Sequence, residues 1–425
     1  MQSEFFTLDP RLAVLADQAQ KRAEKQFAAI EETTEYNQQK VLSAFIRHQV
    51  SESHFVATTG YGYGDRGRDT LDEVFAEVMG TEDALVRHSI LSGTHAIAIA
   101  LFGVLRPGDV LLAATGEPYD TLLPVIGADG SSPGSLREFG VDYRKVDLTN
   151  DGKPDIAAIR EALRRIPKIK LIHIQRSRGY SLRPSLTVEE IGEIIRAVRQ
   201  EKPEAIVFVD NCYGEFVQRF EPSAVGADLM AGSLIKNPGG GIAENGGYIC
   251  GRRDLVELCA YRMTTPGLGR EIGASLGHNR TLYMGLFHAP HVVGEALKTA
   301  VFCAALMELA GYEASPASNE PRADIIQALK LRTPEALIAF CQGMQKGAPV
   351  DAFVTPEPWD MPGYDSQVIM AAGAFTMGAS IELSADAPLR EPYAAYMQGG
   401  LNYHSGKIGV LLAAQSMLEK GILQL

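Results

Sequence analysis

Two short apolar segments in the middle of the chain each end in a polar side chain. Residues 205–209 read as a buried strand that leads into Asp210. Residues 227–232 read as a second strand that leads into Ser233 and then Lys236, and three consecutive glycines follow the lysine closely. Because open α/β sheets bind ligands at the carboxyl ends of their strands, we expect the acid and the lysine to share one site.

A carboxylate opposite a lysine is the pair of groups that pyridoxal phosphate (PLP) requires. The lysine amine can form a Schiff base with the cofactor's aldehyde, and the acid can keep the pyridine nitrogen protonated, so that the ring accepts electrons. The pattern therefore predicts a PLP site built on Lys236 and Asp210. A surface lysine on a turn and a strand-end aspartate are the alternative interpretation of the same two residues.

The composition excludes several classes of partner. The chain has 425 residues, 46% of them hydrophobic, and a net charge of −12 without a long run of one sign. This charge argues against nucleic acid and anionic membranes as partners. The five cysteines form no CxxC pair, and the sequence shows neither a leader pattern nor an apolar run that could cross a bilayer. We therefore expect a cytoplasmic protein with reduced thiols.

Strand-like and helical segments alternate through most of the chain. This alternation predicts an α/β fold with a mainly parallel sheet. We expect an N-terminal helical arm at residues 1–55, a large domain at 56–300 and a smaller C-terminal α/β domain at 301–425. In the last part, residues 322–331 and 334–343 read as helices.

Polar side chains mark the starts of two predicted helices. Thr187 and Glu190 have the spacing of a capping box. Ser92, Gly93 and Thr94 open a helix of small residues and could offer backbone N–H groups and hydroxyls to a phosphate. An ordinary N-cap explains these three residues equally well.

Three other motifs suggest different chemistries. Gly62, Gly64 and Gly67 match the GxGxxG turn of dinucleotide-binding proteins, but the residues before them form a poor strand, and a flexible connector is the alternative. Ser233 and Lys236 also match the SxxK motif of serine acyl-enzymes, but the SDN and KTG motifs that accompany it do not occur. The HAPH segment at 288–291 could suggest a metal site, but its proline argues against a single helical face, no acid or cysteine cluster accompanies it, and we expect both histidines to be structural.

Three longer motifs carry a resemblance to a known family. The segments SGTHAI, VFVDNCYGEFVQ and GADLMAGSLIKNPGGG occur in this order along the chain, with matching strand context. The chain resembles the fold-type-I PLP enzymes of Cys/Met metabolism, and within them the methionine gamma-lyase-like proteins sometimes called aluminium-resistance proteins. The resemblance covers roughly residues 55–410. It implies a large PLP-binding domain with a mainly parallel sheet, a smaller C-terminal domain, and a homodimer or homotetramer with shared active sites.

The resemblance implies roles for individual residues. Lys236 would hold PLP covalently, and Asp210 would bind the pyridine nitrogen. Tyr119 would stack on the ring and lie near enough to act as an acid, and Tyr63 would reach the phosphate of a neighbouring subunit. The phosphate contacts would come from Ser233, Ser92, Gly93 and Thr94. The substrate carboxylate would bind to Arg390, because a planar guanidinium suits bidentate recognition.

The chain departs from the family pattern at three places. Ile235 replaces a hydroxyl residue before the lysine. The family's Tyr-x-Arg pattern is altered, so that either Arg66 or Arg68 could take the arginine's role. After the expected strand at residues 168–175, where the family has an Asn-Pro segment, stand Arg176 and Arg178, which could bind a phosphate or a second substrate carboxylate, or could be solvated loop residues.

The resemblance implies a PLP-dependent carbon–sulfur lyase that acts on a sulfur-containing amino acid of the cystathionine or methionine type by β- or γ-elimination. We expect burial and the neighbouring iminium to lower the pKa of the freed Lys236, so that this lysine takes the Cα proton and a thiolate departs. A γ-replacement transferase and a PLP-fold binding or regulatory protein without turnover are the alternatives. A nicotinamide-dependent dehydrogenase would require the GxGxxG turn to be genuine.

Overall fold

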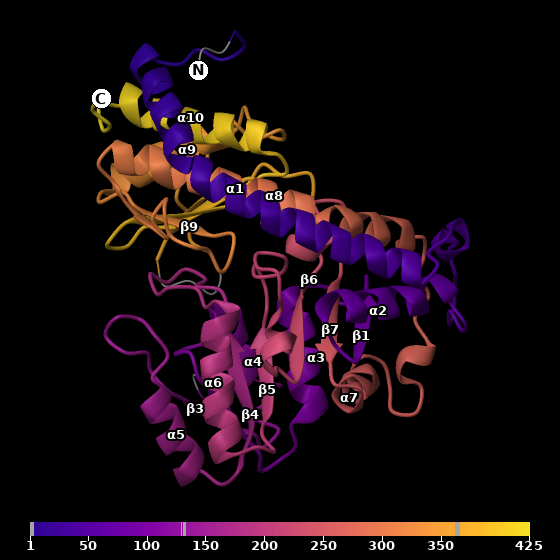
Figure 1. Ribbon diagram of the computed structural model, residues 1–425. Helices are drawn as coiled ribbons and strands as arrows, with labels where there is room; N and C mark the ends of the chain where they lie inside the picture. Colours follow the sequence, from indigo (N-terminus) through magenta and orange to yellow (C-terminus); the bar gives the residue numbers. More distant parts are fainter. Residues whose placement is uncertain (1–3, 129, 131–132, 362–365) are drawn as a thin grey trace. The chain divides into compact units, whose positions relative to one another are not determined.

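The computed structural model describes residues 4–128, 130, 133–361 and 366–425, and the chain divides into two compact units (Figure 1). The larger unit is Asn37–Phe287, and the smaller unit combines Met1–Tyr36 with His288–Leu425. Two long helices, α1 (Pro10–Arg47) and α8 (Asn279–Leu309), carry the chain from one unit to the other.

The bounds of these units differ from the three expected segments. The start of α1 is not a separate arm, because Leu12, Ala16 and Ala19 are buried in the core of the smaller unit. The helix α8 continues through Pro290, so that both histidines of the HAPH segment belong to one helix. The division into folding domains at residues 55 and 300 stays a prediction. None of the described helices combines the length and the apolar character needed to span a bilayer.

The larger unit contains a sheet whose described strands follow the order β1-β7-β6-β5-β4-β2-β3. The pairs β2–β3, β2–β4, β4–β5 and β5–β6 are parallel, and β7 pairs antiparallel with β6 and β1. The expected α/β fold with a mainly parallel sheet is thus confirmed. The strands are β1 (Asp83–Arg87), β2 (Val110–Ala113), β3 (Asp142–Lys145), β4 (Ile169–Gln175), β5 (Ile206–Asp210), β6 (Leu229–Ser233) and β7 (Gly247–Gly251).

Helices cover this sheet because its central strands are apolar on both faces. Every residue of β5 is buried, as in a parallel strand between two helical layers. The helix α3 packs with α7 against one apolar cluster of the sheet, whereas α5 and α6 lie side by side. The predicted capping box at Thr187 and Glu190 is confirmed at the start of α6. The helices are α2 (Arg66–Met79), α3 (Gly93–Val104), α4 (Leu123–Ile126), α5 (Ile156–Arg165), α6 (Val188–Glu201) and α7 (Arg253–Met263).

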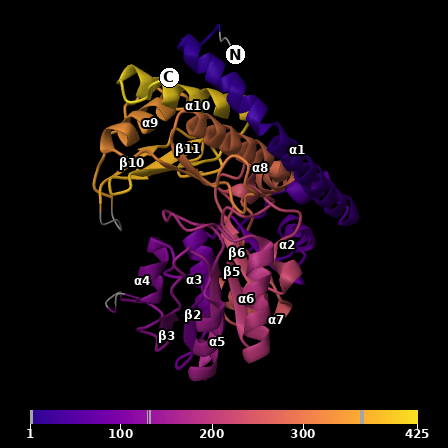
Figure 2. The ribbon, with the colours of Figure 1, turned by 60° about the vertical axis from the view of Figure 1, so that its left-hand side comes forward.

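The smaller unit has an antiparallel sheet in the order β10-β11-β12-β9-β8. Its helices α9 (Pro334–Lys346) and α10 (Tyr403–Glu419) pack side by side (Figure 2). The predicted helix at 322–331 is wrong, because this segment contains β9, which pairs with β12 and β8. The strands are β8 (Glu313–Ser315), β9 (Gln327–Lys330), β10 (Val368–Ala371), β11 (Ser384–Pro388) and β12 (Ala394–Gln398).

Candidate active site

The two polar strand ends lie at the same edge of the large sheet. Asp210 is the last residue of β5 and pairs in register with Ala231 of the neighbouring β6, which ends at Ser233. The carboxylate of Asp210 is buried, and its Oδ1 accepts a hydrogen bond from the backbone N–H of Cys212 at 3.1 Å. Strand spacing and sequence thus place a buried acid next to the segment that carries Lys236.

Lys236 follows β6 and has a half-buried side chain. Its Nζ lies 4.0 Å from the centroid of the Tyr213 ring, and none of the described residues forms a hydrogen bond or an ion pair with it. Burial alone would lower the pKa of Lys236, but the neighbouring Cys212, Tyr213 and carboxylates outweigh burial and raise it above the ordinary value. In the chain alone burial thus does not lower the pKa of Lys236, and the lowered pKa expected for the freed lysine beside the iminium stays a prediction.

The start of α3 lies against Ser233. A Cβ atom at Gly93 would stand 3.4 Å from the Ser233 Cβ and 3.1 Å from the Cys212 Sγ, so only glycine allows this approach without displacement. Ser92 caps the helix, and its hydroxyl accepts from the N–H of His95 at 3.1 Å. The hydroxyl of Thr94 lies 2.8 Å from that of Thr121. A helix N-terminus beside a buried serine is suited to a phosphate.

The chemistry of these groups fits PLP. The site offers an amine without a hydrogen-bond partner among the described residues, a buried carboxylate on the adjoining strand, and a helix start packed on Ser233. PLP needs one group of each kind for its aldehyde, its pyridine nitrogen and its phosphate.

Tyr119 lies in the segment after β2. Its backbone N–H donates to Oε1 of Gln175, the last residue of β4, at 2.7 Å. Its ring meets the ring of Tyr180 edge-on, with 5.9 Å between centroids. The roles of Tyr119 as a stacking residue and as an acid stay predictions.

Arg176 is not a loop residue in solvent. It is completely buried, and its guanidinium donates to Asn211 Oδ1 at 2.8 Å, Gln218 Oε1 at 3.2 Å and Glu221 Oε2 at 3.3 Å. The ion pair with Glu221 explains how a buried arginine is tolerated. Arg178 is also buried, so that the solvated interpretation is wrong for both arginines. Substrate binding by Arg178 stays a prediction.

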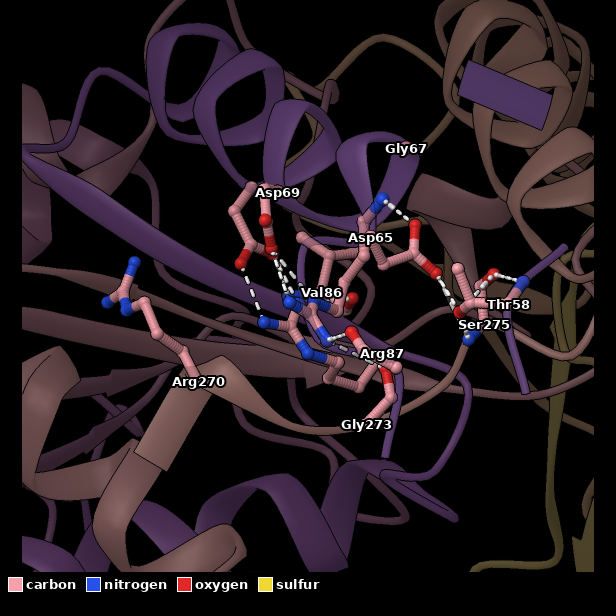
Figure 3. Close-up of polar contacts among 12 residues, drawn as sticks. Thr58, Asp65, Gly67, Asp69, Val86, Arg87, Arg270, Gly273 and Ser275 are labelled. Carbon is pink, nitrogen blue, oxygen red and sulfur yellow. Dashed lines mark hydrogen bonds and ion pairs between the residues drawn. The ribbon is translucent and has the colours of Figure 1, made fainter. Parts of the chain in front are cut away.

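The segment with the glycine motif is held by a buried carboxylate. Figure 3 shows the carboxylate of Asp65 beside Thr58 and Ser275, which both lie on the same side of it. Its Oδ1 accepts from the Arg68 N–H at 2.9 Å and from Asn279 Nδ2 at 3.2 Å, and its Oδ2 accepts from the Ser275 N–H at 3.2 Å and from the Thr58 hydroxyl. Burial alone would raise the pKa of Asp65, but these donors outweigh it and lower the pKa to about 2.

This carboxylate also excludes the dinucleotide interpretation. Asp65 is the N-cap of α2, so an acid occupies the helix end that a pyrophosphate would need. The described residues ahead of the glycines contain the 3₁₀ turn Glu52–Phe55 and no strand.

Arg68 is buried and donates to the carbonyls of Gly62 and Gly273, both at 2.9 Å, whereas Arg66 is exposed. Tyr63 keeps 61% of its surface exposed, and its contact with another subunit stays a prediction.

Arg390 belongs to the smaller unit and lies exposed in the turn between β11 and β12. Its role as the carboxylate-binding residue stays a prediction.

The histidines His288 and His291 both lie in α8, and no group of potential metal ligands occurs among the described residues.

Sequence reasoning missed three residues near the predicted site. Tyr213 contacts Lys236, as described above. Glu215 is fully buried, and its Oε1 accepts from the hydroxyl of Tyr248 at 2.8 Å. Burial raises the pKa of Glu215 to about 8. On β4, His173 is fully buried against the ring of Phe208, and burial lowers its pKa to about 4. The signal for Tyr213 and Glu215 was their place in the DNCYGEF segment between the acid and the lysine.

Comparisons with known proteins find similar proteins over nearly the whole chain. The family model described as methionine gamma-lyase matches residues 12–418. A carbon–sulfur lyase of Clostridium novyi NT, involved in aluminium resistance, is 52% identical over 96% of both chains, with a TM-score of 0.93. A Clostridium acetobutylicum protein proposed to be a cystathionine beta-lyase involved in aluminium resistance is 53% identical over 96% of both chains, also with a TM-score of 0.93. The protein YnbB of Bacillus subtilis (strain 168) is 54% identical over 93% of each chain.

Proposed function

Because the chain belongs to the methionine gamma-lyase family of PLP-dependent lyases, we propose that it cleaves a carbon–sulfur bond in an amino acid of the cystathionine or methionine type. The observation that carries this proposal is the amine of Lys236, without a hydrogen-bond or ion-pair partner among the described residues, in the segment after the strand that adjoins Asp210. The solved relatives that match over nearly the whole chain support the same reaction class.

The proposed reaction needs a strong electron acceptor, and bound PLP supplies it by withdrawing electrons from the substrate's Cα. Lys236 would hold the cofactor in the resting enzyme and would later take the proton from Cα. Asp210 would keep the pyridine nitrogen protonated, and its burial in an apolar sheet keeps competing water away from this ion pair.

Leaving-group departure needs a proton donor, and the carboxylate of the substrate needs a cation. Tyr119 is our candidate for the donor, and Arg390 is our candidate for the cation. Ser92, Gly93, Thr94 and Ser233 would bind the phosphate, with Tyr63 of a second copy of the chain. A homodimer or homotetramer in a cytoplasmic setting is part of this proposal.

Elimination and γ-replacement would use the same residues, so the two reactions must be distinguished by their products. The purified protein should show the yellow absorbance of a PLP enzyme, and borohydride should fix the cofactor on Lys236. A panel of cystathionine, methionine and cysteine should then yield a keto acid, ammonia and a thiol from at least one member. Added thiol that is incorporated into a new amino acid would instead indicate the γ-replacement transferase.

Lys236→Ala tests the assignment directly. We expect loss of the yellow band and a decrease in turnover of at least about a thousandfold, because both cofactor attachment and proton abstraction use this amine. Turnover at the wild-type rate in this variant would contradict the proposal. A coloured wild-type protein that turns over no amino acid of the panel would favour the binding or regulatory alternative.

A further inference from the structure

The segment between β5 and β6 contains two aromatic residues in the left-handed backbone region. Tyr213 has a φ of 71° and Phe216 has a φ of 63°. Bulky side chains rarely adopt this conformation, which persists only where the surroundings enforce it and which clusters at functional sites. Both residues therefore need a physical explanation.

A buried polar cluster holds this segment in place. Glu221 accepts from the Phe216 N–H at 2.9 Å and from Asn211 Nδ2 at 3.0 Å, and it pairs with the buried Arg176. The guanidinium of Arg176 fills the space beside Gly214, where a Cβ atom would lie 2.6 Å or less from three atoms of the arginine. The backbone between the two aromatic residues is thereby fixed by contacts that do not involve Tyr213.

Packing in the core explains why Phe216 keeps a left-handed backbone conformation. Its side chain is 2% exposed, and the Nζ of Lys40 lies 5.6 Å from its ring centroid. Tyr213 differs, because its ring is only half-buried and its face meets Lys236 at 4.0 Å. At this distance a lysine is attracted by the negative face of the ring, and the attraction grows when the pair is partly removed from water.

The segment that carries the lysine is tied to the same cluster. The side chain of Asn237, the residue after Lys236, donates from Nδ2 to the carbonyl of Glu215 at 3.0 Å. The strained backbone of Tyr213 and the backbone of Lys236 thus belong to one rigid arrangement, with the ring face and the amine directed at one another.

We propose that Tyr213 is a positioning residue whose ring face holds the amine of Lys236 in one place, so that it attacks an incoming aldehyde from a defined direction. The inference rests on the proposed function of Lys236 as the residue that binds PLP. In that attack the ammonium first loses one proton to solvent, the nitrogen then forms a double bond to the aldehyde carbon, and its two remaining protons leave with the carbonyl oxygen as water. Removal of the ring leaves the flexible lysine side chain to sample other rotamers, which lowers the rate of capture.

The test measures the rate at which protein freed of cofactor captures PLP, followed by visible absorbance at several pH values. Tyr213→Asn removes the ring with a residue that tolerates the left-handed backbone, and Tyr213→Phe keeps the ring as the matched control. We expect capture about tenfold slower with Tyr213→Asn at every pH and within twofold of wild type with Tyr213→Phe. Thermal melting of each variant reports whether the fold is retained.

A double-mutant cycle separates positioning from other roles. In the Lys236→Ala background, equilibrium dialysis should show that Tyr213→Asn leaves noncovalent PLP binding within twofold, because its partner is gone. A decrease in binding that persists without Lys236 would overturn the proposal in favour of a direct contact with the cofactor or a structural role. Capture that is unchanged or faster with Tyr213→Asn would also overturn it. If wild type captures PLP no better than Lys236→Ala, the proposed function itself is wrong.

Discussion

Two buried carboxylates in the larger unit have pKa values that are shifted in opposite directions. Asp65 is 1% exposed and its pKa is lowered to about 2, whereas Glu215 is 0% exposed and its pKa is raised to about 8. Burial opposes ionisation of both groups. The difference lies in the donors, since two backbone N–H groups and two side chains donate to the carboxylate of Asp65, whereas Tyr248 is the only described side chain that donates to the carboxyl group of Glu215.

The comparison shows what each carboxylate can do for its segment. Asp65 stays ionised and ties together the start of α2 and the residues around Ser275, which supports the exposed loop that carries Tyr63. Glu215 keeps its proton through neutral pH and lies in the segment that presents Tyr213 to Lys236. A neutral acid there avoids a second negative charge beside Glu221, which raises the pKa of Glu215 further.

Removal of Asp65 should have the largest effect on stability. Asp65→Ala leaves four donors without their acceptor and removes the N-cap of α2, so we expect a loss of about 3 kcal/mol in the free energy of unfolding. Urea denaturation near neutral pH measures this loss. The matched control is Asp69→Ala, an exposed partner of Arg68 in the next turn, which should cost about 1 kcal/mol or less. Equal losses in the two variants would contradict the role assigned to Asp65.

The proton on Glu215 should make stability depend on pH. Between the ordinary pKa of 4.5 and the folded value of about 8, the folded chain keeps a proton that the unfolded chain has released. The free energy of unfolding should therefore fall as pH rises through this window, by at most about 1.4 kcal/mol per pH unit from this group. Glu215→Gln has no proton to release and should lack this contribution.

Urea denaturation of wild type and Glu215→Gln between about pH 5 and about pH 8 measures the contribution of that one proton. We expect the variant to gain about 2 kcal/mol relative to wild type across the range, because buried groups relax and reduce the full effect. Other titrating groups contribute equally to both proteins and cancel in the difference. A constant difference between the two proteins at all pH values would show that Glu215 is ionised in the folded chain.

Loss of the Tyr248 hydroxyl that donates to the Glu215 carboxyl group should have the smallest effect on the free energy of unfolding. Tyr248→Phe removes the hydroxyl that donates to Glu215 at 2.8 Å but keeps the ring, which packs on Phe75 with 4.7 Å between centroids. We expect a loss of about 1 kcal/mol in the free energy of unfolding, because the carboxyl group is left without this bond. The same variant should move the pH dependence of wild type to higher pH, since the hydroxyl favours the ionised form of Glu215. Movement to lower pH would refute this explanation.

Short-range patterns predicted much of the candidate site. The apolar runs before Asp210 and before Ser233 are buried strands, and the chain order places their polar ends at one edge of the sheet. The capping box at Thr187 was equally readable, because all of its hydrogen bonds lie within four residues. In these cases the residues that decide the structure are neighbours along the chain.

Long-range partners explain the predictions that were wrong. Residues 322–331 contain a strand because β12, more than sixty positions later, offers a pairing edge that outweighs local helix propensity. Arg176 is buried because Glu221 and Gln218, from another segment, accept hydrogen bonds from its guanidinium. The residues around Arg176 in the sequence do not predict these partners. The first residues of α1 belong to a core because the C-terminal part of the chain packs on them.

The sequence by itself determined the class of fold and the cofactor chemistry, and it predicted Lys236 as the residue that would carry the cofactor, because apolar strands and the order of acid, serine, lysine and glycines are local properties. Only the tertiary structure decided the charge state of Glu215, the burial of Arg176 and the contact of Tyr213 with Lys236. These properties depend on how many donors, charges and ring faces surround a group after folding, and distant segments supply most of them.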